Sequence, residues 1–152
     1  MSLTTLIGDY SSYASLDEAD SYFLIKLDAN TWDIADSLDK KKALIQATKQ
    51  IDRFSYRGNR TDSNQPHEFP RNGDLTIPKN ILEATCEIAY ALLDGFDPDA
   101  DYEDLNTSSY QYAEVTNRFQ NRMEFHHLLG LPSNTVFMLL SPFMRDPRDI
   151  TI

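Results

Sequence analysis

The segment that most constrains the fold of this chain is residues 39–71, which read DKKKALIQATKQIDRFSYRGNRTDSNQPHEFPR. Its first half has the spacing of an amphipathic helix, which Ser37 can cap and which we expect to end at Gly58. The apolar stripe of this helix is Leu44, Ala47, Ile51 and Phe54. The second half of the 39–71 segment is polar and irregular and ends in Phe69-Pro70-Arg71. Loops longer than about 12–15 residues are usually functional or disordered, and these bulky residues favour a functional arm.

Apolar residues at helical spacing predict three further helices. The first covers about residues 15–28, because Ser15 and Glu18 have the spacing of a capping box. Another, at about 79–94, begins after Pro78 and should be the most buried. A short helix opens at Leu131-Pro132 and ends at Ser141-Pro142. The apolar residues of these helices are Ala19, Tyr22, Phe23 and Leu27; then Ile81, Ala84, Thr85, Ile88, Leu92 and Leu93; then Val136, Met138, Leu139 and Leu140.

The remaining segments complete the expected fold. Trp32 is predicted to be a core residue between the first two helices. Residues 94–104 carry six carboxylates and no cation, which is typical of a solvated loop. Residues 107–127 fit a helix and period-two segments equally well, and we favour extended structure. We therefore expect a mainly α fold: a small bundle of about four helices, a long extended arm (about 59–77), possible short β segments in 107–127 and an extended C-terminal tail.

Charge and composition narrow the classes of function. The net charge of −10 argues against a dedicated DNA-binding protein, because such binding depends on lysine and arginine, but it does not exclude one local basic face. The single cysteine, Cys86, excludes an internal disulfide, fits a cytoplasmic origin and is expected to be a small core residue. No apolar run approaches the roughly 20 residues that a membrane helix needs, and we expect no signal peptide.

The sequence contains no pattern typical of an enzyme or a metal site. Residues 97–108 match a calcium loop at positions 1, 3 and 5, but Tyr102 and Ser108 stand where glycine and glutamate are required. His126 and His127 are adjacent, so they diverge on a helix or a strand and are poor co-ligands. Phosphate-binding and nucleophile motifs are absent. We expect no catalysis and no cofactor.

A basic stripe is the one signal for nucleic acid. It consists of Lys42, Lys49, Arg53 and Arg57 on the helical half of the 39–71 segment. Such a stripe can meet phosphates, but it is more often the solvated face of an amphipathic helix. It could equally pair with the acidic loop of a neighbouring subunit.

Several short pieces occur in a defined order along nearly the whole chain. They are YASLDEADSYF at 13–23, Trp32, KALIQAT at 42–48 with Ile51-Asp52, YRG at 56–58, QPHEFPR at 65–71, Ile77-Pro78, Ala84-Thr85 and LLSPF at 139–143. Together they resemble the phage head-to-tail connector proteins, also called adaptor or head-completion proteins. Some members of that family are labelled DnaT-like single-stranded-DNA-binding proteins. Residues 96–127 match least.

The resemblance implies a single connector domain over residues 1–152, whose copies form a ring, commonly twelvefold. The ring would lie in the virion neck beneath the portal protein, bind a downstream tail or head-closure protein, and let double-stranded DNA pass without sequence-specific contact. On this hypothesis the arm lies on the adjacent subunit, anchored by Phe69, Pro70 and Arg71. The tail 143–152 would reach the portal through Phe143, Arg145, Arg148, Ile150 and Ile152. The alternative is a single-stranded-DNA-binding module that uses the basic stripe; we prefer the connector.

Overall fold

The structure is a computed structural model that describes residues 4–99, 126 and 129–145. In this part of the chain the fold is mainly α, with five helices and one two-stranded sheet, as predicted. Almost all of 107–127, where short β segments were expected, and residues 146–152 of the tail lie outside the described residues.

The chain begins with a β-hairpin that the sequence analysis missed. Strands β1 (Thr4–Ile7) and β2 (Tyr10–Ser12) pair antiparallel. Helix α1 (Leu16–Leu24) follows, and its predicted capping box is confirmed, since Ser15 accepts a hydrogen bond from the Glu18 backbone and Glu18 accepts one from the Ser15 backbone. The helix ends at Leu24, earlier than the predicted residue 28, and the backbone then turns at Asp28, which has a positive φ of 57°. Leu27 is 93% exposed and is not part of a buried stripe.

Trp32 is a core residue, as predicted, and a short helix that was not predicted carries it. This helix, α2 (Asn30–Ile34), buries the indole until only 1% of the residue is exposed. The ring stacks on Phe23 with centroids 4.5 Å apart, and its Nε1 donates to Asp20 Oδ1 at 2.8 Å. A buried tryptophan usually needs such a hydrogen bond, so Asp20 helps to hold α2 against α1.

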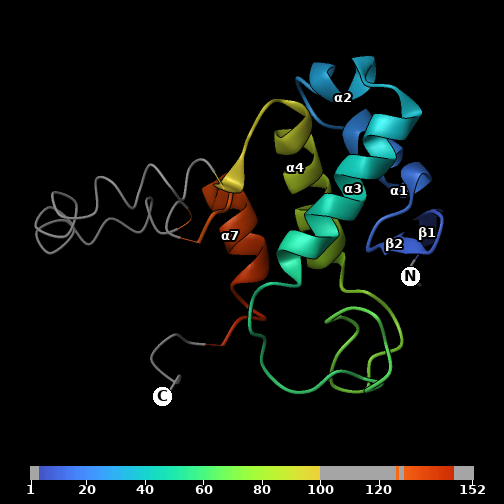
Figure 1. Cartoon of the computed structure of the whole chain (residues 1–152). Coiled ribbons are helices and arrows are strands. Elements are labelled where there is room, and N and C mark those ends of the chain that lie inside the picture. The colour runs from blue at the N-terminus through green and yellow to red at the C-terminus, as the bar shows by residue number, and fades with distance from the viewer. Residues whose placement is uncertain (1–3, 100–125, 127–128, 146–152) are drawn as a thin grey trace, which may run out of the picture.

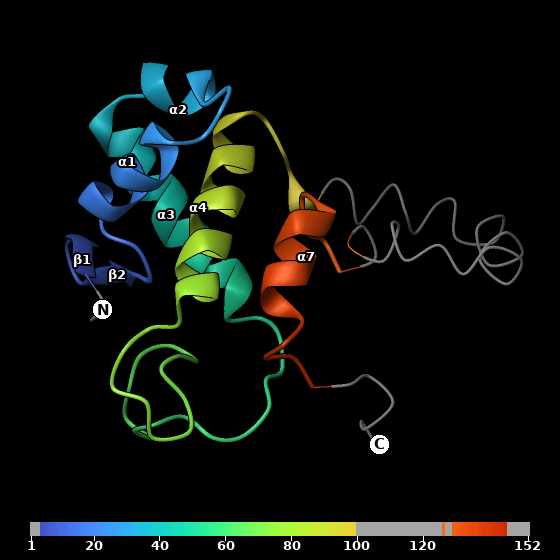
Figure 2. The same ribbon diagram turned by 180° about the vertical axis from the view of Figure 1, so that it is seen from behind.

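Two long helices form the centre of the fold. Helices α3 (Ser37–Ile51) and α4 (Lys79–Leu93) lie side by side, and the arm joins their lower ends (Figures 1 and 2). The N-cap of α3 is Asp36 rather than Ser37, and α3 ends at Ile51 rather than at Gly58. Helix α7 (Asn134–Leu140), capped by Ser133, packs on α4 on the side away from α1.

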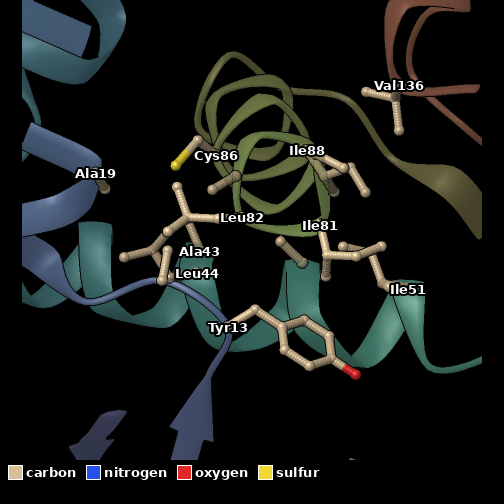
Figure 3. Close-up of a cluster of buried hydrophobic side chains, with 14 of the residues drawn as sticks. Tyr13, Ala19, Ala43, Leu44, Ile51, Ile81, Leu82, Cys86, Ile88 and Val136 are labelled. Carbon is tan, nitrogen blue, oxygen red and sulfur yellow. The ribbon is translucent and has the colours of Figure 1, made fainter. Parts of the chain in front are cut away.

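Helix α4 contacts the other helices with different faces. Figure 3 shows Ile81 beside Ile51 of α3, Cys86 toward Ala19 of α1, and Ile88 toward Val136 of α7. Cys86 is fully buried, which confirms it as a core residue, and burial raises the pKa of its thiol. The predicted apolar face of α4 is therefore the contact surface of the bundle.

The base of the arm generates the first prediction, which compares two glycines with positive φ. Both Gly58→Ala and Gly73→Ala place a side chain at such a φ, which costs roughly 1–2 kcal/mol. Only the Cβ at Gly58 would meet another residue, 1.8 Å from Asn72 Oδ1, which accepts the Asn59 backbone N–H. We expect Gly58→Ala to lower the free energy of unfolding by about 1 kcal/mol more than Gly73→Ala. Urea denaturation measures both, and equal losses would contradict the packing described at Gly58.

Candidate functional site

The arm folds back onto its own chain, and Phe69 is its main anchor. This residue is 1% exposed. Its ring lies 4.7 Å from that of Tyr56, 5.5 Å from that of Phe143 and 6.0 Å from that of Tyr13, in edge-to-face arrangements. Such aromatic contacts add about 0.5–1.5 kcal/mol each beyond the area they bury. Phe69 is therefore part of the hydrophobic core.

Arg71 closes the base of the arm through several hydrogen bonds. Its guanidinium donates to the Gly58 carbonyl at 2.7 Å, to the Arg57 carbonyl at 3.0 Å and to Glu68 Oε2 at 2.8 Å. Only 8% of the residue is exposed. Because guanidinium presents several donors in a rigid fork, one side chain joins the start of the arm to its end.

The anchors of the arm, which were predicted to lie on a neighbouring subunit, contact their own chain in the structure. Phe69 and Arg71 are buried in their own chain, and the half-buried Pro70 accepts the Thr61 backbone N–H at 3.1 Å. The sequence showed that the arm had bulky anchors, but not which surface they would cover. Their predicted contact with an adjacent subunit stays untested.

The described start of the tail is also held by its own chain. Phe143 packs on Phe69, and its carbonyl accepts the Arg57 backbone N–H at 2.8 Å. Arg145 donates its backbone N–H to Ser55 and its Nε to Tyr56 O, each at 3.1 Å. The other proposed portal-facing residues, Arg148, Ile150 and Ile152, lie outside the described residues.

The basic stripe forms an exposed surface, which we call the basic face. Its residues are Lys42 and Lys49 on α3 and Arg53 and Arg57 beyond the end of the helix, and all four are exposed. None of the four forms an ion pair with another residue of the described ranges. Lys49 Nζ lies 4.9 Å from the ring centroid of Tyr10, which is 58% exposed. A cation and an open aromatic ring thus lie side by side.

The electrostatic character of the basic face changes along its length. An open depression runs beside Lys49 and Arg53, and Asp97 and Asp99 line its other side. These two carboxylates oppose an approaching phosphate near Arg53. The Tyr10–Lys49 end is therefore the better place for an anion, and Tyr10 was not identified from the sequence.

A second surface, the apolar corner, was also missed. It consists of Leu24, Ile25, Leu27, Ile34 and Leu38, which are between 52% and 93% exposed. They belong to the end of α1, to α2 and to the start of α3, at one end of the molecule (Figure 1). The only Lys or Arg in residues 16–39 is Lys26, which pairs with Glu87 at 2.7 Å. The exposed charges between Leu24 and Asp39 are thus acidic, whereas Lys40, Lys41 and Lys42 follow directly on α3.

A hydrogen-bonded chain of Ser11, His67 and Asp52 joins the hairpin, the arm and the end of α3. Ser11 Oγ lies 2.8 Å from His67 Nε2, and His67 Nδ1 lies 2.5 Å from Asp52 Oδ2. The serine and the histidine are 56 positions apart. No spacing rule connects residues so distant, so only the fold brings them together.

The packing of the arm generates a second prediction. We expect Phe69→Ala to lower the free energy of unfolding by about 3–5 kcal/mol, because it removes a fully buried aromatic side chain. Leu75→Ala is the matched control: it lies on the same arm, is 87% exposed, and should change stability by less than about 0.5 kcal/mol. Chemical denaturation followed by circular dichroism measures both. Similar small losses would mean that the arm is not docked in solution.

The described residues contain neither a membrane-spanning helix nor a cluster of potential metal ligands. No helix among them is both long and apolar enough to cross a membrane. No group of three or more potential metal ligands gathers anywhere in the described ranges.

Comparison with known proteins bears on the identity of the chain. The family described as putative DnaT-like ssDNA binding protein matches residues 3–127, which is most of the 152 residues. No curated protein and no solved structure gave a match. The match agrees with the single-stranded-DNA label that accompanies the resemblance noted in the sequence, and does not concern a connector. The chain belongs to the family of putative DnaT-like single-stranded-DNA-binding proteins.

Proposed function

We propose that the protein binds single-stranded DNA on its basic face, with Tyr10 as the stacking platform. The observation that carries this proposal is the exposed Tyr10 ring beside Lys49, next to further cations on α3. Proteins that bind single strands combine a basic track for phosphates with aromatic rings on which bases stack. The family match supports the same class of ligand.

The overall charge limits what kind of binding this can be. A chain with a net charge of −10 repels DNA at long range, so electrostatic steering does not help association. Binding would depend on short-range contacts with Tyr10 and Lys49, since Tyr10 does not line the depression that Asp97 and Asp99 share with Lys49 and Arg53. We therefore expect weak, salt-sensitive binding without sequence preference.

Fluorescence anisotropy with a labelled oligothymidylate tests the proposal. Tyr10→Ala should weaken binding about 5- to 150-fold, because stacking of one base contributes about 1–3 kcal/mol. The triple variant Lys42→Glu, Lys49→Glu, Arg53→Glu should reduce the slope of log affinity against log salt by about 2, if each residue meets one phosphate.

Lys79→Glu is the matched control for these variants. Lys79 is an exposed cation on α4 that is not part of the basic face, and its substitution by glutamate changes the total charge as Lys49→Glu does. It should leave the affinity within about twofold of wild type. Equal losses in Lys49→Glu and Lys79→Glu, or no binding in low salt, would refute a binding site on the basic face.

The apolar corner favours a second candidate function, a ring-forming connector. Exposed apolar patches with a polar rim often mark protein–protein contacts, and the exposed carboxylates of Asp33 and Asp36 lie beside this corner. Lys49 of the basic face lies farther along α3, and Arg53 lies just beyond the end of this helix. A head-to-tail contact between the apolar corner of one copy and the basic face of the next would close into a ring or extend as a filament. In this candidate function, copies of the chain form a ring of twelvefold symmetry in the virion neck. The ring binds the portal protein on one side and a downstream tail protein on the other.

Two variants that cannot self-associate test the head-to-tail contact. The corner variant is Ile25→Asp, Leu27→Asp, and the face variant is Lys49→Glu, Arg53→Glu. Each alone should be monomeric by light scattering, whereas an equimolar mixture should form a dimer, since each variant keeps the surface that the other lacks.

Different outcomes separate the candidates. A wild-type protein that stays monomeric up to millimolar concentration, and leaves purified portal rings bare in electron micrographs, would exclude the connector. If the wild type does assemble, single-stranded DNA should compete with assembly, because both use the basic face.

A further inference from the structure

We propose that Ser11 is a base-activated nucleophile that accepts an acyl group from activated esters, with His67 as its general base and Asp52 as the residue that orients His67. Ser11 Oγ is 2.8 Å from His67 Nε2, and His67 Nδ1 is 2.5 Å from Asp52 Oδ2. Nucleophile, base and orienting carboxylate therefore stand in the order used by serine hydrolases, which is recognised by geometry and not by sequence position.

The proton positions follow from the groups around Asp52. Its Oδ1 accepts from the Tyr13 hydroxyl and from the Glu68 backbone N–H at 3.2 Å. Burial, with the nearby charge of Asp52, raises the pKa of Tyr13, so this hydroxyl keeps its proton and remains a donor. Asp52 is thus an acceptor on both oxygens, and His67 Nδ1 must carry a hydrogen. In neutral His67 the lone pair is then on Nε2, which faces the Ser11 hydroxyl.

The surroundings hold the base in place and leave the nucleophile accessible. The His67 ring packs against Tyr13 with centroids 5.4 Å apart, and its side chain is 14% exposed. Ser11 on β2 is only half-buried. The carboxylate of neighbouring Glu68 is engaged by Arg60 and Arg71 at 2.8 Å each, so it does not compete for the imidazole. Solvent-borne esters can reach the hydroxyl, while the imidazole is restrained from three sides.

The chemical step balances without any cofactor. Ser11 Oγ attacks the carbonyl carbon as His67 Nε2 takes the hydroxyl proton, and a bond forms between Oγ and the acyl carbon. The ester C–O bond then breaks, and the leaving alkoxide or phenoxide takes the proton from His67. The products are an ester on Ser11 and a free alcohol or phenol. General-base assistance of this kind contributes about 10²–10⁴-fold in rate.

The alternative is that the same chain of hydrogen bonds only ties the arm to the hairpin and to α3. On that reading Ser11 is no more reactive than any surface serine. Ser63, exposed on the same arm, provides the reference within one molecule.

The experiment treats the full chain with p-nitrophenyl acetate and measures acetylation of each serine by peptide mass spectrometry over time. We expect Ser11 to be acetylated at least about 100-fold faster than Ser63. His67→Gln should bring Ser11 down to the rate of Ser63, Ser11→Ala should remove the fast site, and Ser63→Ala should leave it unchanged.

The ratio of the acetylation rates of Ser11 and Ser63 in the wild type decides the proposal even if a variant fails to fold. Equal rates at Ser11 and Ser63, or a fast Ser11 that persists in folded His67→Gln, would overturn it. The test does not depend on nucleic-acid binding, because Ser11 is not part of the basic face and no DNA is present.

Discussion

Asp52 joins parts of the chain that are far apart in the sequence. It caps the end of α3 and accepts hydrogen bonds from the Tyr13 hydroxyl, from His67 and from the Glu68 backbone. A partly buried carboxylate needs such donors, because desolvation is costly when charge is not compensated. The hydrogen bonds of Asp52 therefore hold three parts of the chain in one arrangement: the residue that follows the hairpin, the end of α3 and the arm. The aromatic contacts of Phe69 then bury the side of the arm that Asp52 positions.

The two exposed surfaces have opposite character, and both are organised by α3. Its start contributes Leu38 to the apolar corner, whereas Lys42 and Lys49 lie farther along it and Arg53 lies just beyond its end. A net charge of −10 describes the chain as a whole but hides this separation. Local charge decides which ligands a surface can bind, because screening limits the range of interactions between exposed charges to roughly 10 Å. A protein of this composition can thus offer one site for anions and another for a protein partner.

Features that depend on neighbouring residues were predictable from the sequence. The capping box of Ser15 and Glu18, the helix that follows Pro78, the end of the last helix at Ser141 and the core position of Trp32 are all confirmed. Features that depend on distant contacts were not. The apolar pattern ran on past Ile51, but the structure ends α3 there, and Asp52 contacts the arm and the hairpin exit. Leu27 had the spacing of a buried residue on the first helix, yet α1 ends at Leu24 and Leu27 is exposed.

The candidate sites divide in the same way. The amino-acid sequence by itself determined the helical class, the basic stripe and the presence of an arm with bulky anchors, because helical periodicity and side-chain chemistry are local properties. Only the tertiary structure decided that the arm packs on its own chain, that Tyr10 lies beside Lys49, and that Ser11 meets His67. The physical reason is that these contacts join residues tens of positions apart, and their geometry is set by how the helices pack rather than by spacing along the chain.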